Sequence, residues 1–597
     1  MKHRIEAFAA TLLPFAFLAS TVGLTYAPCY ATLCTEDFLP RETKIHLGTF
    51  YVMLALFAIG LLLRSSFDSC NALCSRGTPF KIPIIQKRIT CGGFLASVWI
   101  VSATLGTTGI WLPSLLDYWG RRTDPLDWTS AKIQLTITGV TGHYADFLMG
   151  ILVIPVSRNS LVGRAFGVHQ STLFFVHKIV SYLFLAAVLA HGIGYALYAT
   201  SPSSEGDERK DEAFSTGNPT MTCEEGKARS SWYGTTTYNG AATLVVIIII
   251  VVTSLPYIRR RHYNFFYYFH IICGVSIVGG ASVHASTDFY LVLPGLFLYV
   301  IDLIHRFFFG EAGGLRRKTV ATVENAGGDW YRISVPPFER AAAGEESCSL
   351  STEKATSTGY PLKCFYLNFP AISKMQIHAF TAAKSSTIDS GAVFLFQRSQ
   401  GKPQKALDKE WTWKLGALVP KKNDRKEMEL RLEGPYLPRD TRFETTSRII
   451  CIVGGTGITG AHSLALWWLE MRASNDHSHF TLIWTIRHGE ATAIDEWVQL
   501  KQIASFTPRL KLVAHVSSET GRLDPEAHLR QSLGFDQVTE TTTITSGQET
   551  AWVYGSGPDG LLHTTDSACA KIWRNIRKGS DTSNVKELNW YMAKWEV

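Results

Sequence analysis

The chain has no Cys-x-x-Cys pair, although its 597 residues include 11 cysteines. None of the cysteines shows the spacing of a metal-ligand set, so the sequence excludes a metal site built on paired cysteines. Cys29 and Cys34 are close enough in sequence for a small disulfide on the outer side of a membrane. Cys70 and Cys74 are expected to be structural.

Charged residues are also scarce, at 18% of the chain, and they are scarcest before about residue 310, where apolar runs dominate. Beyond that point the sequence is typical of a soluble α/β protein. The net charge of +8 does not indicate nucleic-acid binding, because the basic residues cluster between apolar runs, as in the cytosolic loops of membrane proteins. We therefore expect several domains, a lipid bilayer as partner and no nucleic acid.

Seven apolar stretches predict membrane helices, and most reach the ~20 residues that a span requires. They are residues 46–63, 91–113, 143–157, 174–198, 240–258, 267–285 and 289–308, of which 143–157 is the shortest. If the helices alternate in direction, the basic clusters all face one side, which is then the cytosol. These clusters are Arg64, Arg76, Lys81, Lys87 and Arg88; Arg158 and Arg164; Arg259, Arg260 and Arg261; and Arg316, Arg317 and Lys318. The slightly acidic segment 199–239 is then outside.

The N-terminus begins Met1-Lys2-His3-Arg4 and continues with an apolar run from Leu12 to Leu24. This pattern is typical of a signal peptide that ends near Ala27. An uncleaved first transmembrane helix is the alternative, so residues 1–27 are predicted to be one or the other.

Four histidines form two pairs with the same spacing, His177 with His191 and His270 with His284. At about 100° and 1.5 Å per helical residue, fourteen residues return a side chain to nearly the same face, about 21 Å further along the helix. Imidazoles inside a bilayer are costly unless they have a function. Two such helices form a cage for two stacked b-type haems, with His177/His270 near the cytosol and His191/His284 near the outer face. Capping or core histidines are the alternative, which the equal spacing argues against.

The second half begins with short β-branched or aromatic runs that predict a small antiparallel barrel. They are residues 319–323, 331–335, 365–369 and 393–397. The polar segment 339–360 between them is expected to be a surface insertion.

A nucleotide site is predicted where the apolar strand 449–453 runs into a glycine-rich turn and then the helical run 461–470. Such a turn brings backbone N–H groups and a helix N-terminus to a phosphate. The turn reads Gly454-Gly455-Thr456-Gly457-Ile458-Thr459-Gly460. The next strand, 480–486, ends at Arg487, which is either a partner for a 2′-phosphate or a solvated arginine. The strand 551–554 ends in Gly555-Ser556-Gly557-Pro558, a turn expected to line the nicotinamide pocket.

With these motifs the chain resembles the fungal ferric-chelate reductases, whose superfamily also holds the NADPH oxidases; the resemblance runs from about residue 90 to the C-terminus. The family's flavin motif His-Pro-Phe-Thr/Ser appears here as His378-Ala379-Phe380-Thr381, without the proline. The resemblance implies that Phe380 and Thr381 contact the isoalloxazine of FAD; barrel core is the alternative. Trp411-Thr412-Trp413-Lys414-Leu415 resembles the helix start at the FAD pyrophosphate, and Gly434-Pro435-Tyr436 resembles the turn before the nucleotide domain.

Two positions near the nicotinamide and the C-terminus complete the resemblance. The family usually has a cysteine where this chain has Ser556, and Trp595 is the counterpart of an aromatic residue that can cover the flavin. The changes at Ala379 and Ser556 are expected to affect turnover rate more than reaction type.

The predicted fold is therefore multi-domain. A signal peptide or first helix (1–27) precedes an α-helical transmembrane bundle with a haem-binding core (46–310), a ferredoxin-reductase-like β-barrel FAD domain (316–440) and an α/β NADPH-binding domain (445–597). The resemblance implies a plasma-membrane metalloreductase that passes electrons from cytosolic NADPH through FAD and two haems to extracellular ferric or cupric chelates. A superoxide-generating NADPH oxidase is the first alternative, although oxidases typically shorten the second histidine spacing by one. A non-catalytic haem-binding sensor or transporter is the second, against which the nucleotide half argues.

Overall fold

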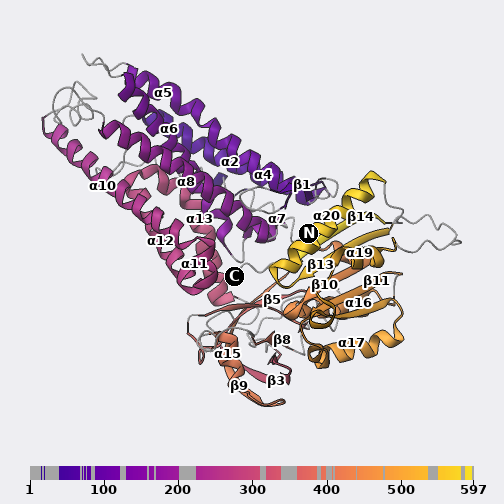
Figure 1. Ribbon diagram of the computed structural model, residues 1–597. Helices are drawn as coiled ribbons and strands as arrows, with labels where there is room; N and C mark the ends of the chain where they lie inside the picture. The colour runs from indigo at the N-terminus through magenta and orange to yellow at the C-terminus, as the bar shows by residue number, and fades with distance from the viewer. Residues whose placement is uncertain are drawn as a thin grey trace, which may run out of the picture. The chain divides into compact units, whose positions relative to one another are not determined.

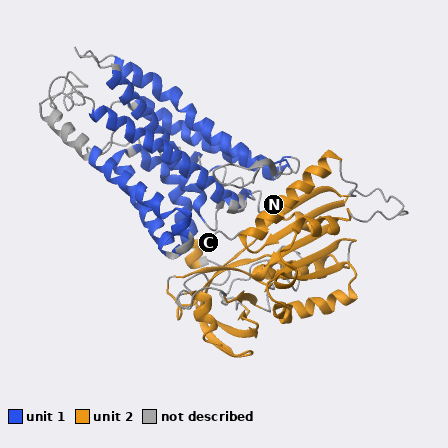
Figure 2. Cartoon of the chain, in the orientation of Figure 1, with its two compact units in different colours: residues 1–303 blue, residues 304–597 orange. Residues whose placement is uncertain are grey.

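The chain forms two compact units in the computed structural model, residues 1–303 and 304–597, drawn in two colours in Figure 2. The structure describes residues 39–67, 88–120, 129–157, 170–200, 223–309, 318–337, 360–374, 376–385, 391–398, 410–437, 440–474, 477–535, 549–579 and 585–593, with Leu407 and shorter pieces within 12–19, 70–81 and 161–168. Trp595, the Cys29–Cys34 pair, most of the predicted signal peptide and most of segments 199–239 and 339–360 lie outside the described residues.

The first unit consists mainly of long apolar helices, labelled in Figure 1. They are α2 (Pro40–Ser66), α4 (Cys91–Gly106), α5 (Thr108–Gly120), α6 (Thr129–Leu152), α8 (Gln170–Thr200), α10 (Cys223–Thr253), α12 (Tyr263–His284) and α13 (Ser286–Ile304). Shorter elements are β1 (Gly77–Lys81), β2 (Arg88–Thr90), η1 (Ile154–Val156), α7 (Leu161–Phe166), α11 (Pro256–Arg261) and, at the start of the second unit, η2 (His305–Phe309). Within the described residues, six helical segments are long and apolar enough to cross a membrane: 41–66, 91–120, 130–156, 172–200, 265–284 and 287–308.

The third of these segments starts far earlier than the predicted 143, because polar residues interrupt the apolar pattern of α6 without ending the helix. The hydroxyls of Thr136, Thr138 and Thr141 each donate to the backbone carbonyl four residues back, at 2.6–2.8 Å. A threonine that satisfies its hydroxyl inside its own helix can lie in an apolar medium. The predicted boundary at 143 is therefore wrong, as is the start at 46, since α2 begins at Pro40.

The predicted span 240–258 ends too late, because α10 stops at Thr253. Pro256 opens the separate helix α11. A proline disfavours helical geometry in the residue before it and has no N–H to continue the ladder. The turn at Ser254 and Leu255 follows from this, and it brings Ser254 into the site described below.

The second unit begins with a seven-stranded antiparallel sheet in the order β6-β5-β9-β3-β4-β8-β7. Its strands are β3 (Lys318–Gly327), β4 (Trp330–Val335), β5 (Cys364–Asn368), β6 (His378–Thr381), β7 (Lys384–Ser385), β8 (Ala392–Gln397) and β9 (Arg425–Tyr436), with the short helix α15 (Trp411–Gly416) against them. β9 was not predicted, because charged residues alternate along it with Met428, Leu430 and Leu432. Those three side chains are buried in the barrel core.

A five-stranded parallel sheet follows, in the order β12-β11-β10-β13-β14. Its elements are β10 (Arg448–Gly454), β11 (His479–Ile486), β12 (Leu510–Val516), β13 (Glu549–Ser556) and β14 (Val585–Ala593), with α16 (Ile458–Met471), α17 (Asp495–Phe506), α18 (Ser517–Thr520), α19 (Pro525–Leu533) and α20 (Asp559–Lys578) and the short turns η3 (Arg442–Glu444), η4 (Gly455–Gly457) and η5 (Gly489–Ala493). Alternate residues of β10 face two cores, Cys451 toward α16 and α17 and Ile450 toward α19 and α20. Helices therefore cover both faces, and the strand order reverses between β10 and β13, which is where such sheets bind ligands.

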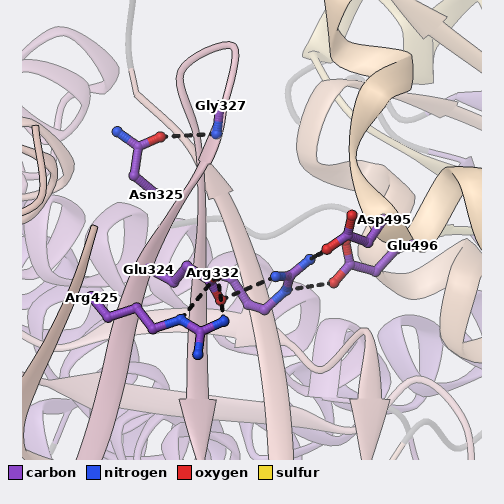
Figure 3. Close-up of polar contacts among 7 residues, drawn as sticks. All are labelled: Glu324, Asn325, Gly327, Arg332, Arg425, Asp495 and Glu496. Atoms are coloured by element: carbon purple, nitrogen blue, oxygen red, sulfur yellow. Dashed lines mark hydrogen bonds and ion pairs between the residues drawn. The ribbon is translucent and has the colours of Figure 1, made fainter. Parts of the chain in front are cut away.

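Arg332 joins the two sheets of the second unit (Figure 3). From β4 its guanidinium donates to both oxygens of Glu496 at 2.8 and 3.1 Å and to Asp495 at 2.9 Å, both at the start of α17. It also donates to Glu324 on the neighbouring strand at 3.2 Å. Burial opposes the charged form, but the carboxylates prevail and raise the pKa of Arg332. This charged network joins the barrel to the start of α17, one of the helices that cover the parallel sheet.

Candidate functional site

The four predicted histidines come together in two pairs in the membrane unit. The ring centroids of His177 and His270 are 6.3 Å apart, and those of His191 and His284 are 6.1 Å apart. This pairing requires α8 and α12 to run in the same direction. Metal–imidazole bonds of about 2 Å on opposite sides of one iron leave about 6 Å between the two ring centroids. Each pair therefore has the separation of two axial ligands of one haem.

Hydrogen bonds fix the tautomer of three of these rings. His177 Nδ1 lies 3.1 Å from the carbonyl oxygen of Leu152, and His191 Nδ1 lies 2.9 Å from that of Thr138. A carbonyl only accepts, so each Nδ1 carries the proton. His270 Nδ1 lies 3.1 Å from the hydroxyl of Ser254, which already donates to the carbonyl of Ile250 and must accept from the ring.

Each of the three rings thus keeps its Nε2 lone pair for a metal. Iron- and zinc-binding histidines usually donate their second ring nitrogen to an oxygen in this way. The donors present fit a haem, whose ligands in each pair would be the two Nε2 atoms.

Two glycines that the sequence analysis did not single out lie against the outer pair. A Cβ added to Gly142 would lie 3.0 Å from Nδ1 of His191, and one added to Gly240 would lie 2.8 Å from Cε1 of His284. The sequence around Gly142 and Gly240 does not identify them as functional, because the rings that they contact belong to other helices, α8 and α12.

Other glycines on the two histidine helices divide into two groups. A Cβ at Gly274 or Gly279 would meet no atom within 4 Å, so the backbone there can be approached closely. Gly194 and Gly280 instead pack against Thr138 and Thr243, as small residues do where two helices approach closely.

The glycine-rich turn after β10 lies against the turn after β13, at the point where the strand order reverses. A Cβ at Gly457 would lie 2.6 Å from the carbonyl oxygen of Ser556, and one at Gly557, whose φ is +140°, would lie 2.9 Å from the nitrogen of Gly454. Only glycine allows this approach. The Thr459 hydroxyl donates to the carbonyl of Thr456 at 3.0 Å, which closes the turn at the start of α16.

A cleft of about 530 Å³ opens in front of this turn, within the second unit. Gly455, Arg487 and Pro558 line it, so the structure brings these three predicted nucleotide residues together. Asp329 and Glu490 line it as well; Asp329 is paired with Arg398 at 2.8 Å. The cleft can hold a phosphorylated ligand with a helix N-terminus and an arginine on its walls.

The predicted flavin residues form an aromatic group on the barrel. His378 and Phe380, on β6, lie 4.6 and 5.8 Å from the ring of Trp411, with Thr412 next to it at the start of α15. Burial lowers the pKa of His378 to about 4, and in the described part of the chain its Nε2 has no hydrogen-bond partner. Phe380 is only partly buried against the barrel core, whereas Thr381 is buried. Phe380 is therefore open to a ligand on one side.

The predicted Gly-Pro-Tyr turn ends β9 and contains a buried charge pair. Gly434 has a φ of +127°, and its peptide bond to Pro435 is cis. The Tyr436 hydroxyl donates to Glu433, and burial together with this carboxylate raises the pKa of Tyr436. Glu433 in turn accepts two bonds from Arg306, at 2.7 and 3.1 Å.

The geometry of the histidine helices agrees with a comparison against known families. Residues 141–281 match the model described as the ferric reductase-like transmembrane component. Ferric reduction oxidase 3, mitochondrial, of Arabidopsis thaliana is 27% identical over 165 residues, which cover 26% of this chain and 22% of that protein. Ferric reduction oxidase 5 of the same plant is 26% identical over 191 residues, which cover 32% of this chain and 23% of that protein. The matched part thus spans less than a quarter of these curated relatives.

Solved structures match part of the chain at low similarity. The cytochrome b5 reductase domain of Ulva prolifera nitrate reductase is 14% identical, with a TM-score of 0.29, over 46% of this chain and 98% of that one. Phthalate dioxygenase reductase is 15% identical, with a TM-score of 0.27, over 46% and 67%. We therefore describe the fold from the strands and helices of this chain alone.

The predicted architecture, a transmembrane helical domain followed by a β-barrel and an α/β domain, is confirmed. The six apolar helices and the family match make this a multi-pass membrane protein. Residues 141–281 of the chain are thus similar to the transmembrane component of ferric reductases.

Proposed function

We propose that the chain is a transmembrane metalloreductase that moves electrons from NADPH through FAD and two b-type haems to ferric or cupric chelates. The observation that carries the proposal is the geometry of the two histidine pairs. In each pair the ring centroids lie about 6 Å apart, and three of the four rings have their Nδ1 proton held by an oxygen of α6 or of Ser254, in the turn after α10. When bound, FAD converts a two-electron donor into single electrons and haem carries them one at a time.

The chain's own residues hold and orient these groups. His177 and His270 would bind the inner haem and His191 and His284 the outer one. The turn from Gly454 to Thr459 would hold the pyrophosphate of NADPH on backbone N–H groups, and Arg487 its 2′-phosphate.

The flavin would lie on the aromatic group of the barrel. Phe380 offers it a partly open ring face, and Thr381 and Thr412 offer hydroxyls. The proposed FAD contacts also include the Gly434–Tyr436 turn and Trp595. Gly557 and Pro558 would line the nicotinamide pocket. Ser556 and Ala379 replace a cysteine and a proline of the family pattern, and we propose that they tune the rate.

We further propose that the reductase half faces the cytosol and that the membrane is the plasma membrane, because all basic clusters of the sequence then lie on the inner side. Two relatives carry the word mitochondrial in their names. Fluorescence microscopy of the tagged full chain separates the two locations.

The test is a spectrum of the purified full-length chain without oxygen. We expect two haems per chain, bound flavin, and loss of the oxidised haem spectrum on addition of NADPH. Ferric citrate, a ferric siderophore, a cupric salt and oxygen are then compared as acceptors. Haem that NADPH cannot reduce would favour a sensor or transporter. Superoxide formation faster than reduction of every metal complex would favour an NADPH oxidase.

A further inference from the structure

A second group of side chains with metal-ligand atoms lies in the membrane unit, apart from the four paired histidines. His46 on α2 and His143 and Asp146 on α6 each offer a ligand atom, and these atoms all lie within 4.8 Å of one another. His46 is fully buried. Ionisable groups in a membrane segment are costly and usually functional, so this cluster requires an explanation.

The His143–Asp146 contact has the geometry of two ligands of one metal ion. His143 Nδ1 lies 3.0 Å from Oδ2 of Asp146. Two donor atoms that share a metal with bonds of about 2 Å lie about 3 Å apart. The proton between them occupies the place of a cation, and a metal ion that binds here releases it.

His46 supplies the third metal-ligand atom. Its Nε2 is buried and, among the described residues, has no hydrogen-bond partner. Its Nδ1 accepts from the indole N–H of Trp111 at 3.1 Å, so the neutral ring carries its proton on Nε2. A metal ion bound at Nε2 displaces that proton. A neutral ring would then carry its proton on Nδ1, where it would meet the indole N–H of Trp111. Trp111 therefore opposes metal binding, while its ring stacks on His143 with centroids 3.4 Å apart.

The cluster is adjacent to the outer histidine pair through one helix. Gly142, the residue before His143, packs on His191, and one turn earlier the carbonyl of Thr138 accepts from the same imidazole. α6 thus carries the support of the outer pair and two of the three ligands of the cluster.

We propose that His46, His143 and Asp146 bind a transition-metal ion and so hold the metal acceptor beside the outer histidine pair. Two imidazoles and one carboxylate suit copper, iron or zinc rather than calcium or magnesium. The inference deepens the proposed function and rests on haem at that pair. A cupric ion bound here would take one electron from ferrous haem held by His191 and His284, which would leave cuprous copper and ferric haem. Cuprous copper prefers sulfur ligands, so reduction favours release.

The binding test uses the full-length chain in detergent, with oxidised haem, titrated with Cu²⁺ and followed by electron paramagnetic resonance. We expect one Cu²⁺ with nitrogen coupling from imidazoles that is lost, or bound at least tenfold more weakly, in His143→Ala and in the isosteric Asp146→Asn. His262→Ala removes an exposed histidine at the start of α12 and serves as the matched control. Wild-type copper signals identical to those of His143→Ala would overturn the site.

Trp111→Phe separates a metal site from a structural hydrogen-bond network. It keeps an aromatic ring against His143 but removes the N–H that competes for His46. Copper should bind about fivefold more tightly, the factor expected for one neutral hydrogen bond. Weaker copper binding in this variant, with haem content retained, would contradict the role assigned to His46.

The acceptor role is tested by mixing the fully reduced protein with Cu²⁺ and following haem reoxidation by stopped flow. We expect reoxidation at least tenfold slower in His143→Ala than in His262→Ala. Copper binding without this difference would overturn the acceptor role. Dithionite serves as the reductant, so the result does not depend on NADPH; failure of NADPH to reduce the haem would instead count against the proposed function alone.

Discussion

The inner and outer histidine pairs have the same spacing and nearly the same ring separation, but different surroundings hold them. The inner rings are fixed where neighbouring helices end, by the carbonyl of Leu152 and the hydroxyl of Ser254. The outer rings are fixed along helices, with the glycines Gly142 and Gly240 against them. Equal spacing in sequence therefore leads to differently supported sites: glycine backbone packs against the outer rings, while hydrogen bonds at helix ends hold the inner rings.

The largest expected effect separates the two pairs by electron order. His177→Ala or His270→Ala should remove the inner haem and abolish haem reduction by NADPH. His191→Ala or His284→Ala should remove only the outer haem and leave the inner one reducible, while metal reduction is lost. Haem content and anaerobic reduction by NADPH check this. Two haems and full activity in all four variants would refute the assignment.

A substitution at the NADPH site, where electrons enter before they reach either histidine pair, should affect the reduction of both haems equally. Arg487→Ala removes a charge-assisted bond to the 2′-phosphate, worth roughly 1.5–3 kcal/mol, or about ten- to a hundredfold in preference for NADPH. NADH kinetics should change little. The measurement is kcat/KM for both nucleotides with haem reduction as readout; an unchanged ratio would mean that Arg487 is only a solvated charge.

Ser254→Ala tests the hydrogen bond that distinguishes the inner pair. It removes the acceptor for His270 Nδ1, and loss of such a partner typically weakens metal binding by about 10- to 100-fold. We expect inner haem to dissociate about tenfold more readily while the outer haem stays. The control is Ser276→Ala on α12, the helix that carries His270; the Ser276 hydroxyl donates to the backbone of its own helix at Ile272. Equal haem retention in both variants would argue against the bond.

The smallest expected effect tests the glycines of the outer pair. In Gly240→Ala the new methyl group would lie 2.8 Å from His284 and force the ring to shift. Outer haem content should fall severalfold at most, with the inner haem unaffected. Gly60→Ala, where a Cβ meets no atom within 4 Å, is the matched control. Loss of both haems would mean that the substitution disturbs the whole bundle.

The sequence predicts what depends on spacing along one element. Fourteen residues on a helix place His177 and His191 on one face, and the pairing with His270 and His284 follows once both helices run the same way. The strand–turn–helix pattern at Gly454 likewise depends only on neighbours in sequence. These are local properties, and the structure reproduces their geometry.

What the sequence did not indicate depends on contacts between distant segments. Gly142 and Gly240 matter through rings on other helices. His46 and His143 are far apart in sequence, and neither is paired at helical spacing with another histidine. The early start of α6 was hidden by threonines that look polar but bond within their own helix. Hydropathy counts the residue type, whereas the membrane responds to whether its hydrogen bonds are satisfied.

The Arg306–Glu433 pair has a practical consequence for anyone who wants the reductase half as a soluble fragment. The barrel strands start at Lys318, which suggests a cut there, yet the second unit begins at Ile304. A fragment that starts at Lys318 would lack Arg306 and leave the Glu433 carboxylate, which is 2% exposed, without its cation. Removing one partner of a buried pair typically costs about 3–5 kcal/mol. The fragment boundary is therefore set by a charge and belongs before residue 304, at the expense of carrying a short apolar segment.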